Sequence, residues 1–181
     1  MKITKLELEG VLLLEPQYFE DYRGYYCETY SKRTLEKEGI DTIFVQDNEA
    51  FSIKKGTVRG IHFQINPKAQ TKLVRCVRGA VLDIVVDLRK KSPTYKKWLS
   101  VELSETNRKQ LLLPKGYGHA YVTLTDNSEF LYKVDEFYEP AYERIVRWND
   151  PEININWGVE DVIASPKDMK APLLKDLDIN F

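Results

Sequence analysis

The feature that most restricts the fold of this chain is a succession of short β-prone segments, each followed by a turn signal. An apolar stretch (6–14) and an aromatic, β-prone stretch (24–30) come first, and the β-prone segments then cover 44–46, 57–64, 72–78, 81–88, 98–103, 109–113, 120–124 and 130–134. The turn signals are Lys55-Gly56, Asn66-Pro67, Arg78-Gly79, Ser92-Pro93, Pro114-Lys115-Gly116 and Asp126-Asn127. Many short strands at nearly regular spacing predict an all-β sandwich or barrel.

Helical patterns are few and short. Ser31 belongs to the residue types that favour a helix N-cap, and a short helix is predicted from there to about Glu38. The stretch from Ser165 onward is predicted to be a loop or short helix packed over the barrel. No repeat or linker divides the chain, and 181 residues suffice for one domain but not for two of ordinary size. We therefore expect a single domain over 1–181 with short peripheral helices.

The composition is that of a globular protein, with 43% hydrophobic and 30% charged residues. A formal net charge of −1 argues against a nucleic-acid surface, so local Arg and Lys groups must hold any anionic ligand. No apolar run approaches the roughly 20 residues that span a bilayer, and no export signal is recognisable. Cys27 and Cys76 form no CxxC pair, and we expect free, buried thiols. These features predict a cytoplasmic protein without membrane or nucleic-acid partners.

Two short motifs narrow the architecture further. The PxGxxH motif that ends at His119 resembles the second motif of cupins, which are double-sheet jelly rolls. The GxHxQ motif around His62 stands where the first cupin motif carries its metal ligands. The order and separation of the two motifs are those of a cupin, so we expect a cupin jelly-roll barrel. His62 and His119 are the chain's two histidines, and both are then expected to point into the same barrel mouth.

The residues around His62 do not complete a metal site. The first motif of a metal cupin supplies two histidines and a glutamate, and a catalytic metal generally needs three protein ligands. Here Gln64 stands where the second histidine would be, no glutamate follows at the expected distance, and Lys72 would repel a cation. We therefore expect no metal and no other cofactor. A metal-dependent cupin oxygenase or isomerase stays as the alternative, which the missing ligands disfavour.

Without a metal, the side chains that could carry a reaction are those that transfer protons or offer a charge. The imidazole of His62 suits proton abstraction at neutral pH, and Lys72 offers a positive charge to a developing oxyanion. Arg23 and Arg59 suit phosphate binding through forked, charge-assisted hydrogen bonds. Tyr132 offers a phenol that can donate a proton, although one of eleven tyrosines also fits simple packing in a β core.

Longer motifs point to one family. They are Asp21-Tyr22-Arg23-Gly24-Tyr25-Tyr26-x-Glu28, Gln46-Asp47-Asn48, Val58-Arg59-Gly60-Ile61-His62-Phe63-Gln64, Ala69-Gln70-Thr71-Lys72-Leu73-Val74, Val86-Asp87-Leu88-Arg89-x-x-Ser92-Pro93-Thr94, Tyr132-Lys133, Tyr138, Trp148-Asn149-Asp150-Pro151, Trp157 and Ser165-x-Lys167-Asp168. With these motifs and PxGxxH, the chain resembles the dTDP-4-dehydrorhamnose 3,5-epimerase family over nearly its whole length. Departures from the family pattern, such as Tyr117-Gly118 for the usual Phe-Ala, remove no titrating group.

The resemblance implies an isomerase that epimerises carbons 3 and 5 of dTDP-4-dehydro-6-deoxyglucose to dTDP-4-dehydrorhamnose, in dTDP-rhamnose biosynthesis. Both carbons flank a ketone, so enolate formation acidifies each C–H bond. By resemblance His62 is the base and Tyr132 the acid. Asp168 pairs with His62, although a capping carboxylate is the alternative for this residue. Lys72 neutralises the enolate, and His119 adds a hydrogen bond near the same oxygen.

The resemblance also implies a nucleotide-sugar site shared by two chains. Tyr138 matches a residue that stacks on the thymine ring, and the other matching binding residues are Arg23, Glu28, Gln46, Asn48, Arg59, Lys72, His119, Glu143 and Lys167. For Glu143 and Lys167, solvated surface charges are an equally good interpretation. Family members form homodimers whose N-terminal strands cross to the partner, so Arg23 and Glu28 are expected to complete the neighbour's pocket.

Two other functions stay open on the sequence. One is a relative that inverts a single carbon or acts on another nucleotide 4-keto sugar. The other is a non-catalytic sugar-binding cupin, which would not need His62, Lys72, Tyr132 and Asp168 together.

Overall fold

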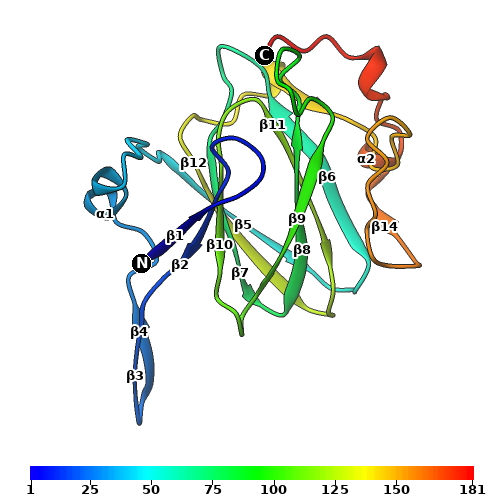
Figure 1. The fold of residues 1–181 in the computed structure, drawn as a ribbon. Coiled ribbons are helices and arrows are strands. Elements are labelled where there is room, and N and C mark those ends of the chain that lie inside the picture. Colours follow the sequence, from blue (N-terminus) through cyan, green and yellow to red (C-terminus); the bar gives the residue numbers. More distant parts are fainter.

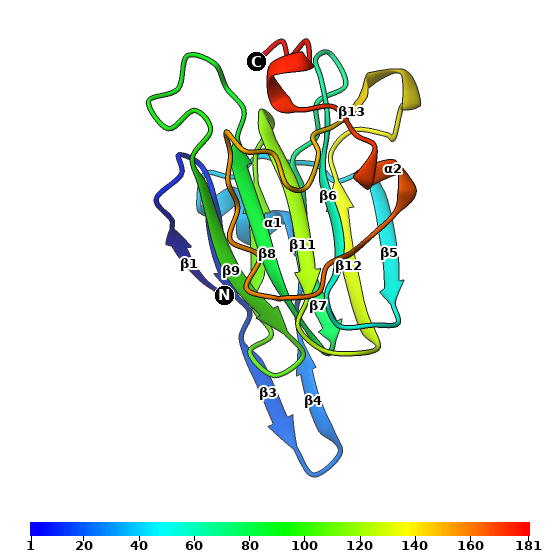
Figure 2. The ribbon, with the colours of Figure 1, turned by 90° about the vertical axis from the view of Figure 1, so that its right-hand side faces the viewer.

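Two sheets that face each other make up most of the computed structural model, which describes residues 1–181 (Figures 1 and 2). The first sheet has the order β1 (Lys2–Lys5), β2 (Leu12–Glu15), β10 (Gln110–Leu113), β7 (Lys72–Arg78), β12 (Ser128–Val134) and β5 (Gln46–Ser52). The second has the order β13 (Glu143–Ile145), β6 (Thr57–Gln64), β11 (Tyr117–Thr123), β8 (Ala80–Asp87) and β9 (Trp98–Ser104), with β14 (Ile163–Ala164) beside β6. The predicted all-β sandwich is confirmed.

An apolar core fills the space between the sheets. Val74 and Phe130 enter it from the first sheet, and Val85 and Tyr121 enter it from the second. Strand β8 is buried on both faces, because Ile84 belongs to a further core on the outer side of its sheet. A strand covered on both faces is apolar almost throughout, which explains why the interior of this strand is hydrophobic except for Asp83.

The C-terminal segment covers the outer face of the second sheet (Figure 2). Trp157, Leu174 and Ile179 pack there against the outward side chains of the sheet, such as Ile61 and Phe63. The segment carries two short helices, α2 (Pro166–Met169) and the 3-10 turn η2 (Leu174–Asp176), and a further 3-10 turn, η1 (Pro140–Tyr142), precedes β13. The expected short helix after Ser165 therefore forms, and it lies beside β6.

The predicted N-terminal helix also forms, as α1 (Lys32–Lys37). Ser31 caps it by accepting a hydrogen bond from the backbone N–H of Thr34 at 3.4 Å, which satisfies one of the free N–H groups of the first turn. Leu35 anchors the helix because its side chain is fully buried. Gly39 follows the helix with a φ of +78°, a conformation that favours glycine.

One element stands apart from both sheets. Strands β3 (Tyr18–Asp21) and β4 (Gly24–Cys27) pair only with each other, and the hairpin projects away from the barrel (Figures 1 and 2). Most of its aromatic side chains lie in solvent, with Tyr22 97% and Tyr26 72% exposed. Arg108 contacts its base, over the rings of Tyr18 and Tyr25, but no strand of the chain pairs with the hairpin. A two-stranded hairpin is at best marginally stable by itself, so this element leaves most of its surface without a partner in the chain.

Several strand boundaries differ from the sequence prediction. Of the apolar stretch 6–14 only the end, from Leu12, is a strand, and β3, β13 and β14 were not predicted. Strand β5 covers Gln46–Ser52 instead of 44–46, because it is an edge strand whose polar side chains hide the apolar alternation. Strand β11 begins at Tyr117 instead of residue 120, because Tyr117 already pairs with Asp87 of β8. No helix is long and apolar enough to cross a bilayer. Both cysteines are free, with Cys76 buried and Cys27 partly buried.

Candidate active site

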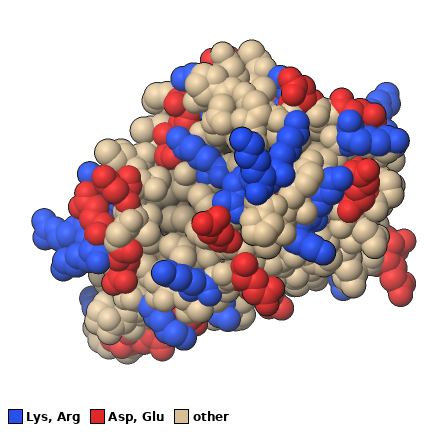
Figure 3. All heavy atoms as spheres, turned by 45° about the horizontal axis from the view of Figure 1, so that its top comes forward, with Lys and Arg blue, Asp and Glu red and all other residues tan.

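A cavity of about 270 Å³ opens at the end of the barrel where β6 ends and β7 begins. Strands of both sheets and the segment between β12 and β13 supply its walls, and the lining residues are Gln46, Asn48, His62, Phe63, Gln64, Gln70, Lys72, Tyr132, Tyr138 and Glu143. Figure 3 is turned toward this end of the molecule and shows Lys and Arg side chains gathered near the middle of the view. Much of the predicted site therefore borders a single hollow.

His62 is held by Asp168. The Nε2 atom of His62 lies 2.6 Å from Oδ1 of Asp168, which is buried at the start of α2. Ser165 Oγ donates to the other carboxylate oxygen at 2.8 Å. Burial opposes ionisation of this carboxyl, but the hydrogen bonds from His62 and Ser165 outweigh it and hold the pKa of Asp168 below its usual value. A charged Asp168 orients the imidazole and fixes its tautomer.

Tyr132 and Lys72 approach the cavity from the first sheet. Tyr132 lies on β12, and the ammonium nitrogen of Lys72, on the neighbouring strand β7, is 5.9 Å from the centre of its ring. Burial raises the pKa of Tyr132, partly opposed by the charge of Arg59, so the phenol carries its proton at neutral pH. Burial lowers the pKa of Lys72 from 10.5 to about 8, with Asp83 and Glu143 acting in the opposite direction. The site thus contains an intact acid and a cation kept in a dry environment.

The second histidine lies behind the cavity instead of in its lining. His119 Nε2 is 2.8 Å from Oδ2 of Asp83, and both side chains are almost completely buried. Burial raises the pKa of Asp83 above its usual value, although the charges of His119 and Lys72 act in the opposite direction. The other carboxylate oxygen of Asp83 has no hydrogen-bond partner. His119 therefore joins the buried polar groups beneath the site, close to Lys72.

Three predicted binding residues form a chain of contacts at the rim. Lys167 Nζ donates to Glu143 Oε2 at 2.7 Å, and the Tyr138 hydroxyl donates to the same oxygen at 3.1 Å. Arg59 is held separately, with hydrogen bonds to Ser52 Oγ at 3.2 Å and to a backbone carbonyl of β5 at 3.0 Å. Glu143 and Lys167 are therefore not isolated surface charges.

Arg23 and Glu28 lie outside this site in the single chain. Arg23 sits at the tip of the β3–β4 hairpin, where its guanidinium pairs with Asp21 at 2.6 Å. Glu28 follows the hairpin and accepts a hydrogen bond from Thr34 Oγ1 at 3.0 Å. The fold of one chain thus brings together the catalytic candidates and most binding candidates, but not these two.

Metal-ligating side chains do not cluster anywhere in the chain. No group of three or more His, Cys, Asp or Glu residues is placed to hold a metal ion. Gln64, at the position of the second cupin histidine, uses its side-chain amide in hydrogen bonds to the backbone.

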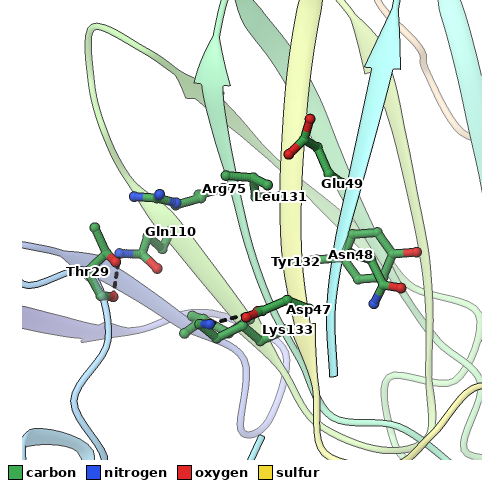
Figure 4. Close-up of a pocket in the computed structure, with 10 residues that line it drawn as sticks. Thr29, Asp47, Asn48, Glu49, Arg75, Gln110, Leu131, Tyr132 and Lys133 are labelled. Carbon is green, nitrogen blue, oxygen red and sulfur yellow. Dashed lines mark hydrogen bonds and ion pairs between the residues drawn. The ribbon is translucent and has the colours of Figure 1, made fainter. Parts of the chain in front are cut away.

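A larger hollow of about 400 Å³ lies elsewhere on the first sheet, along β10, β7, β12 and β5 (Figure 4). An ion pair between Lys133 and Asp47 at 2.7 Å and a hydrogen bond from Gln110 to the backbone of Thr29 at 2.8 Å cross it. This hollow contains neither histidine. It shares Asn48 and Tyr132 with the smaller cavity, so the two hollows adjoin at these strands.

Sequence reasoning did not predict four residues at or beneath the site, namely Phe63, Gln64, Gln70 and Asp83. Asp83 was not singled out, although a lone carboxylate inside the apolar strand Ala80–Asp87 is the signal that marks it. Gln64 was considered only as a missing metal ligand, and nothing local in the sequence shows what its amide contacts.

Comparison with known proteins shows to which family the chain is similar. The family model for dTDP-4-dehydrorhamnose 3,5-epimerase matches residues 5–176. A dTDP-4-dehydrorhamnose 3,5-epimerase of Shigella flexneri is 44% identical over 179 residues, covering 98% of each chain. A dTDP-4-dehydrorhamnose 3-epimerase of Streptomyces niveus is 38% identical over 177 residues, which is 97% of this chain and 85% of that protein.

The fold agrees with these matches. The crystal structure of dTDP-4-dehydrorhamnose 3,5-epimerase from Bacillus anthracis, with TDP and PPi bound, superposes with a TM-score of 0.92 at 47% identity. The match covers 95% of this chain and 98% of that one. The predicted cupin barrel is therefore confirmed, and the chain belongs to the dTDP-4-dehydrorhamnose 3,5-epimerase family.

Proposed function

We propose that this chain epimerises dTDP-4-dehydro-6-deoxyglucose at carbons 3 and 5 to dTDP-4-dehydrorhamnose, a step of dTDP-rhamnose biosynthesis. One observation carries the proposal: an acid–base pair from opposite sheets borders one cavity. His62 on β6, backed by Asp168, supplies the base, and Tyr132 on β12 supplies the acid. Inversion of a carbon needs a base on one face of the sugar ring and an acid on the other, and the two sheets offer these groups from two sides.

Proton abstraction falls to His62. Its Nε2–H donates to Asp168 at 2.6 Å, so Nδ1 carries the lone pair that accepts the proton from carbon 3 or 5. As the C–H bond breaks, its electron pair moves toward the neighbouring ketone and forms the enolate. The imidazolium that results is stabilised by the ionised Asp168.

Lys72 and Tyr132 complete the reaction. The Lys72 ammonium stabilises the negative enolate oxygen, and it does so strongly because the site is dry. Tyr132 then donates its phenolic proton to the opposite face of the carbon. Solvent returns a proton to the phenolate and takes one from the imidazolium, so each inversion leaves the enzyme and the proton count unchanged.

The product of the reaction tests the proposal. Purified protein is incubated with dTDP-4-dehydro-6-deoxyglucose, and the sugar is followed by NMR. The proposal expects a product inverted at both carbons. A product inverted at carbon 3 alone supports the second candidate, a single-carbon epimerase, which the Streptomyces niveus relative favours by its name. An unchanged sugar that nevertheless binds identifies a non-catalytic cupin.

Replacing Lys72 with methionine is expected to lower turnover and to raise the free energy of unfolding at pH 7. Burial lowers the pKa of Lys72 from 10.5 to about 8, so the folded state holds the charged lysine at a cost. A shift of this size corresponds to a stabilisation on the order of 3 kcal/mol for the variant. The gain is complete below pH 8 and disappears as the pH rises to 10.5, where the unfolded chain also loses this charge.

Denaturant unfolding of the parent and of Lys72→Met at pH 7 and pH 10 measures the difference in their free energies of unfolding. The pH dependence of turnover tests the charge of Lys72 in the reaction. The parent is expected to lose activity as the pH rises through about 8, because Lys72 must carry its charge to stabilise the enolate. A Lys72→Met variant that is less stable than the parent at pH 7 would contradict the role of a costly buried cation.

Removal of metal ions is expected to leave the epimerase activity intact. The chemistry assigned to His62, Tyr132 and Lys72 requires only proton transfer and a fixed positive charge. Protein dialysed against EDTA is assayed next to the same protein supplemented with Mg²⁺ or Zn²⁺. Activity that disappears with EDTA and returns with either ion would overturn this prediction.

We propose further that two copies of the chain assemble into a dimer in which the β3–β4 hairpin of each copy reaches the other's cavity. The hairpin is unpaired within its own chain and exposes Tyr22 and Tyr26, so a partner surface would bury apolar area that now faces water. Arg23 on this hairpin and Glu28 beyond it are the two binding candidates that the single chain leaves away from the site.

Mixing two inactive variants tests this assembly. Arg23→Ala chains lack the donated arginine and His62→Ala chains lack the base, but a hybrid dimer contains one site with both residues intact. Random pairing of equal amounts is expected to restore about a quarter of the parental activity, because half of the dimers are hybrids and each has one intact site of two. No recovery after unfolding and refolding the mixture, or a fully active monomer by light scattering, would sink the idea.

A further inference from the structure

Gln64 lines the cavity, but its side-chain amide is not available to a ligand. It lies at the end of β6 and is 3% exposed. Its Nε2 atom donates to the carbonyl of Lys68 at 2.6 Å and to that of Phe137 at 3.1 Å, and its Oε1 atom accepts from the N–H of Glu139 at 2.6 Å. Both ends of the amide are thus engaged by the backbone.

Two further glutamines hold the same segment. Gln46 Oε1 accepts a hydrogen bond from the N–H of Tyr138 at 3.1 Å, and Gln70 Nε2 donates to the carbonyl of Glu136 at 2.8 Å. Residues 136–139 belong to neither β12 nor η1, so no neighbouring strand or helix satisfies their backbone N–H and C=O groups. The glutamine side chains supply these hydrogen bonds instead. We call Gln46, Gln64 and Gln70, which come from three separate parts of the chain, the glutamine clamp.

The held segment carries Tyr138, a wall of the cavity. The backbone N–H of Tyr138 is fixed by Gln46, and its hydroxyl is fixed by Glu143 at 3.1 Å. The side chain is nevertheless half exposed, and the neighbouring Phe137 is 61% exposed, so packing alone does not hold this segment in place. Its order rests largely on hydrogen bonds to side chains.

We propose that Gln64 is a positioning residue that preforms the Tyr138 wall for the nucleotide end of the substrate. The inference rests on the proposed function for the identity of the ligand, a thymidine diphosphate sugar. A wall that is ordered before binding spares the ligand the entropic cost of ordering it, so loss of the clamp weakens binding without touching the proton-transfer groups. Gln64 stands where a metal cupin has its second histidine, and its role in this chain is to fix the shape of the cavity.

Calorimetric binding of dTDP to the parent and to Gln64→Ala tests the inference. The variant is expected to bind dTDP on the order of 10-fold more weakly, which is the cost of ordering one or two side chains. The KM for the sugar nucleotide rises by a similar factor, while kcat stays within about 2-fold of the parent value. Amide hydrogen exchange at Tyr138 and Glu139 becomes faster, because both N–H groups lose a fixed acceptor or its support.

Asn107→Ala provides the matched control. This side-chain amide also makes three backbone hydrogen bonds, to the carbonyl of Glu102 at 2.8 Å and from the N–H groups of Ser104 at 3.1 Å and Lys109 at 3.0 Å. It lies in the turn after β9, at the opposite end of the barrel. It is expected to lower stability without changing dTDP affinity. If Gln64→Ala does not fold, Gln70→Ala, which removes one hydrogen bond of the clamp, is expected to weaken binding in the same direction.

An unchanged affinity for dTDP in folded Gln64→Ala, with only the loss of stability that Asn107→Ala shows, would overturn the inference. A fall in kcat with unchanged KM would overturn it as well, since that pattern places Gln64 in the chemistry. The binding arm does not need turnover. Failure of the proposed function would appear separately, as a parent protein that binds dTDP but does not convert the sugar.

Discussion

Replacing His62 with alanine is expected to abolish exchange of both the carbon-3 and the carbon-5 protons with solvent. The cavity lining contains no second imidazole, because His119 lies behind it and is engaged by Asp83. Without the base, neither C–H bond is broken, so turnover is expected to fall by on the order of 10⁴, the upper end of what general-base catalysis contributes. The measurement is loss of the C–H signals by NMR in deuterium oxide.

Two controls accompany this variant. His62 is partly exposed, so alanine leaves a small cavity open to solvent, and the fold is expected to survive, as circular dichroism checks. Added imidazole enters the space and is expected to restore part of the exchange at both carbons. A His62→Ala protein that exchanges either proton at the parental rate without imidazole would show that another group is the base.

Tyr132→Phe is expected to separate exchange from inversion. The variant keeps the ring and its packing but loses the phenolic proton. His62 still forms the enolate and can return a solvent-derived proton to the original face, so deuterium uptake into the starting sugar remains measurable. Product formation is expected to fall by a factor on the order of 10²–10⁴, the usual contribution of general-acid catalysis. Both rates are read from the same NMR time course.

Tyr121→Phe is the matched control for this change. Tyr121 is a buried tyrosine between the sheets, close to the partly buried Tyr132, with its ring 4.3 Å from that of Phe130, and its hydroxyl has no hydrogen-bond partner. Loss of that hydroxyl is expected to leave turnover unchanged and stability equal or higher, because an unsatisfied buried polar atom is removed. If Tyr132→Phe turns over like Tyr121→Phe, then Tyr132 only packs in the core and the acid is another group or water.

Most of the fold could be predicted from local signals. Apolar segments and turn residues located the central strands, and the Ser31 cap located α1. The pairing of strands could not be read locally, because partners such as β2 and β10 are distant in the sequence and meet only through the folded topology. The edge strand β5 was placed too early because its alternating polar residues resemble a loop.

The candidate site divides in a similar way. His62 and His119 were found through short motifs, but their acidic partners were not equally visible. Asp168 lies 106 positions from His62, and only the resemblance to a family connected them. The sequence also grouped Arg23 with residues of the cavity, although within one chain the hairpin carries it away from that end of the barrel. The family pattern in the sequence therefore did not show where the folded chain places Arg23.

The clamp residues show why the role of some side chains escapes sequence reasoning. Gln46 was predicted only as a binding residue, and Gln64 and Gln70 were not predicted as site residues. All three act on backbone groups of residues 136–139, and a glutamine that binds backbone looks like any other glutamine in the sequence. Their role depends on hydrogen-bond geometry that exists only after the two sheets have closed around the cavity.

Conversion of dTDP-4-dehydro-6-deoxyglucose by the parent protein in deuterium oxide is the decisive test of epimerisation at both carbons. We expect a product that is inverted at carbons 3 and 5 and carries solvent deuterium at both, because each inversion removes one proton to His62 and adds another from Tyr132 after exchange with solvent. A product without deuterium at either carbon, or with label and inversion at one carbon alone, would contradict this expectation.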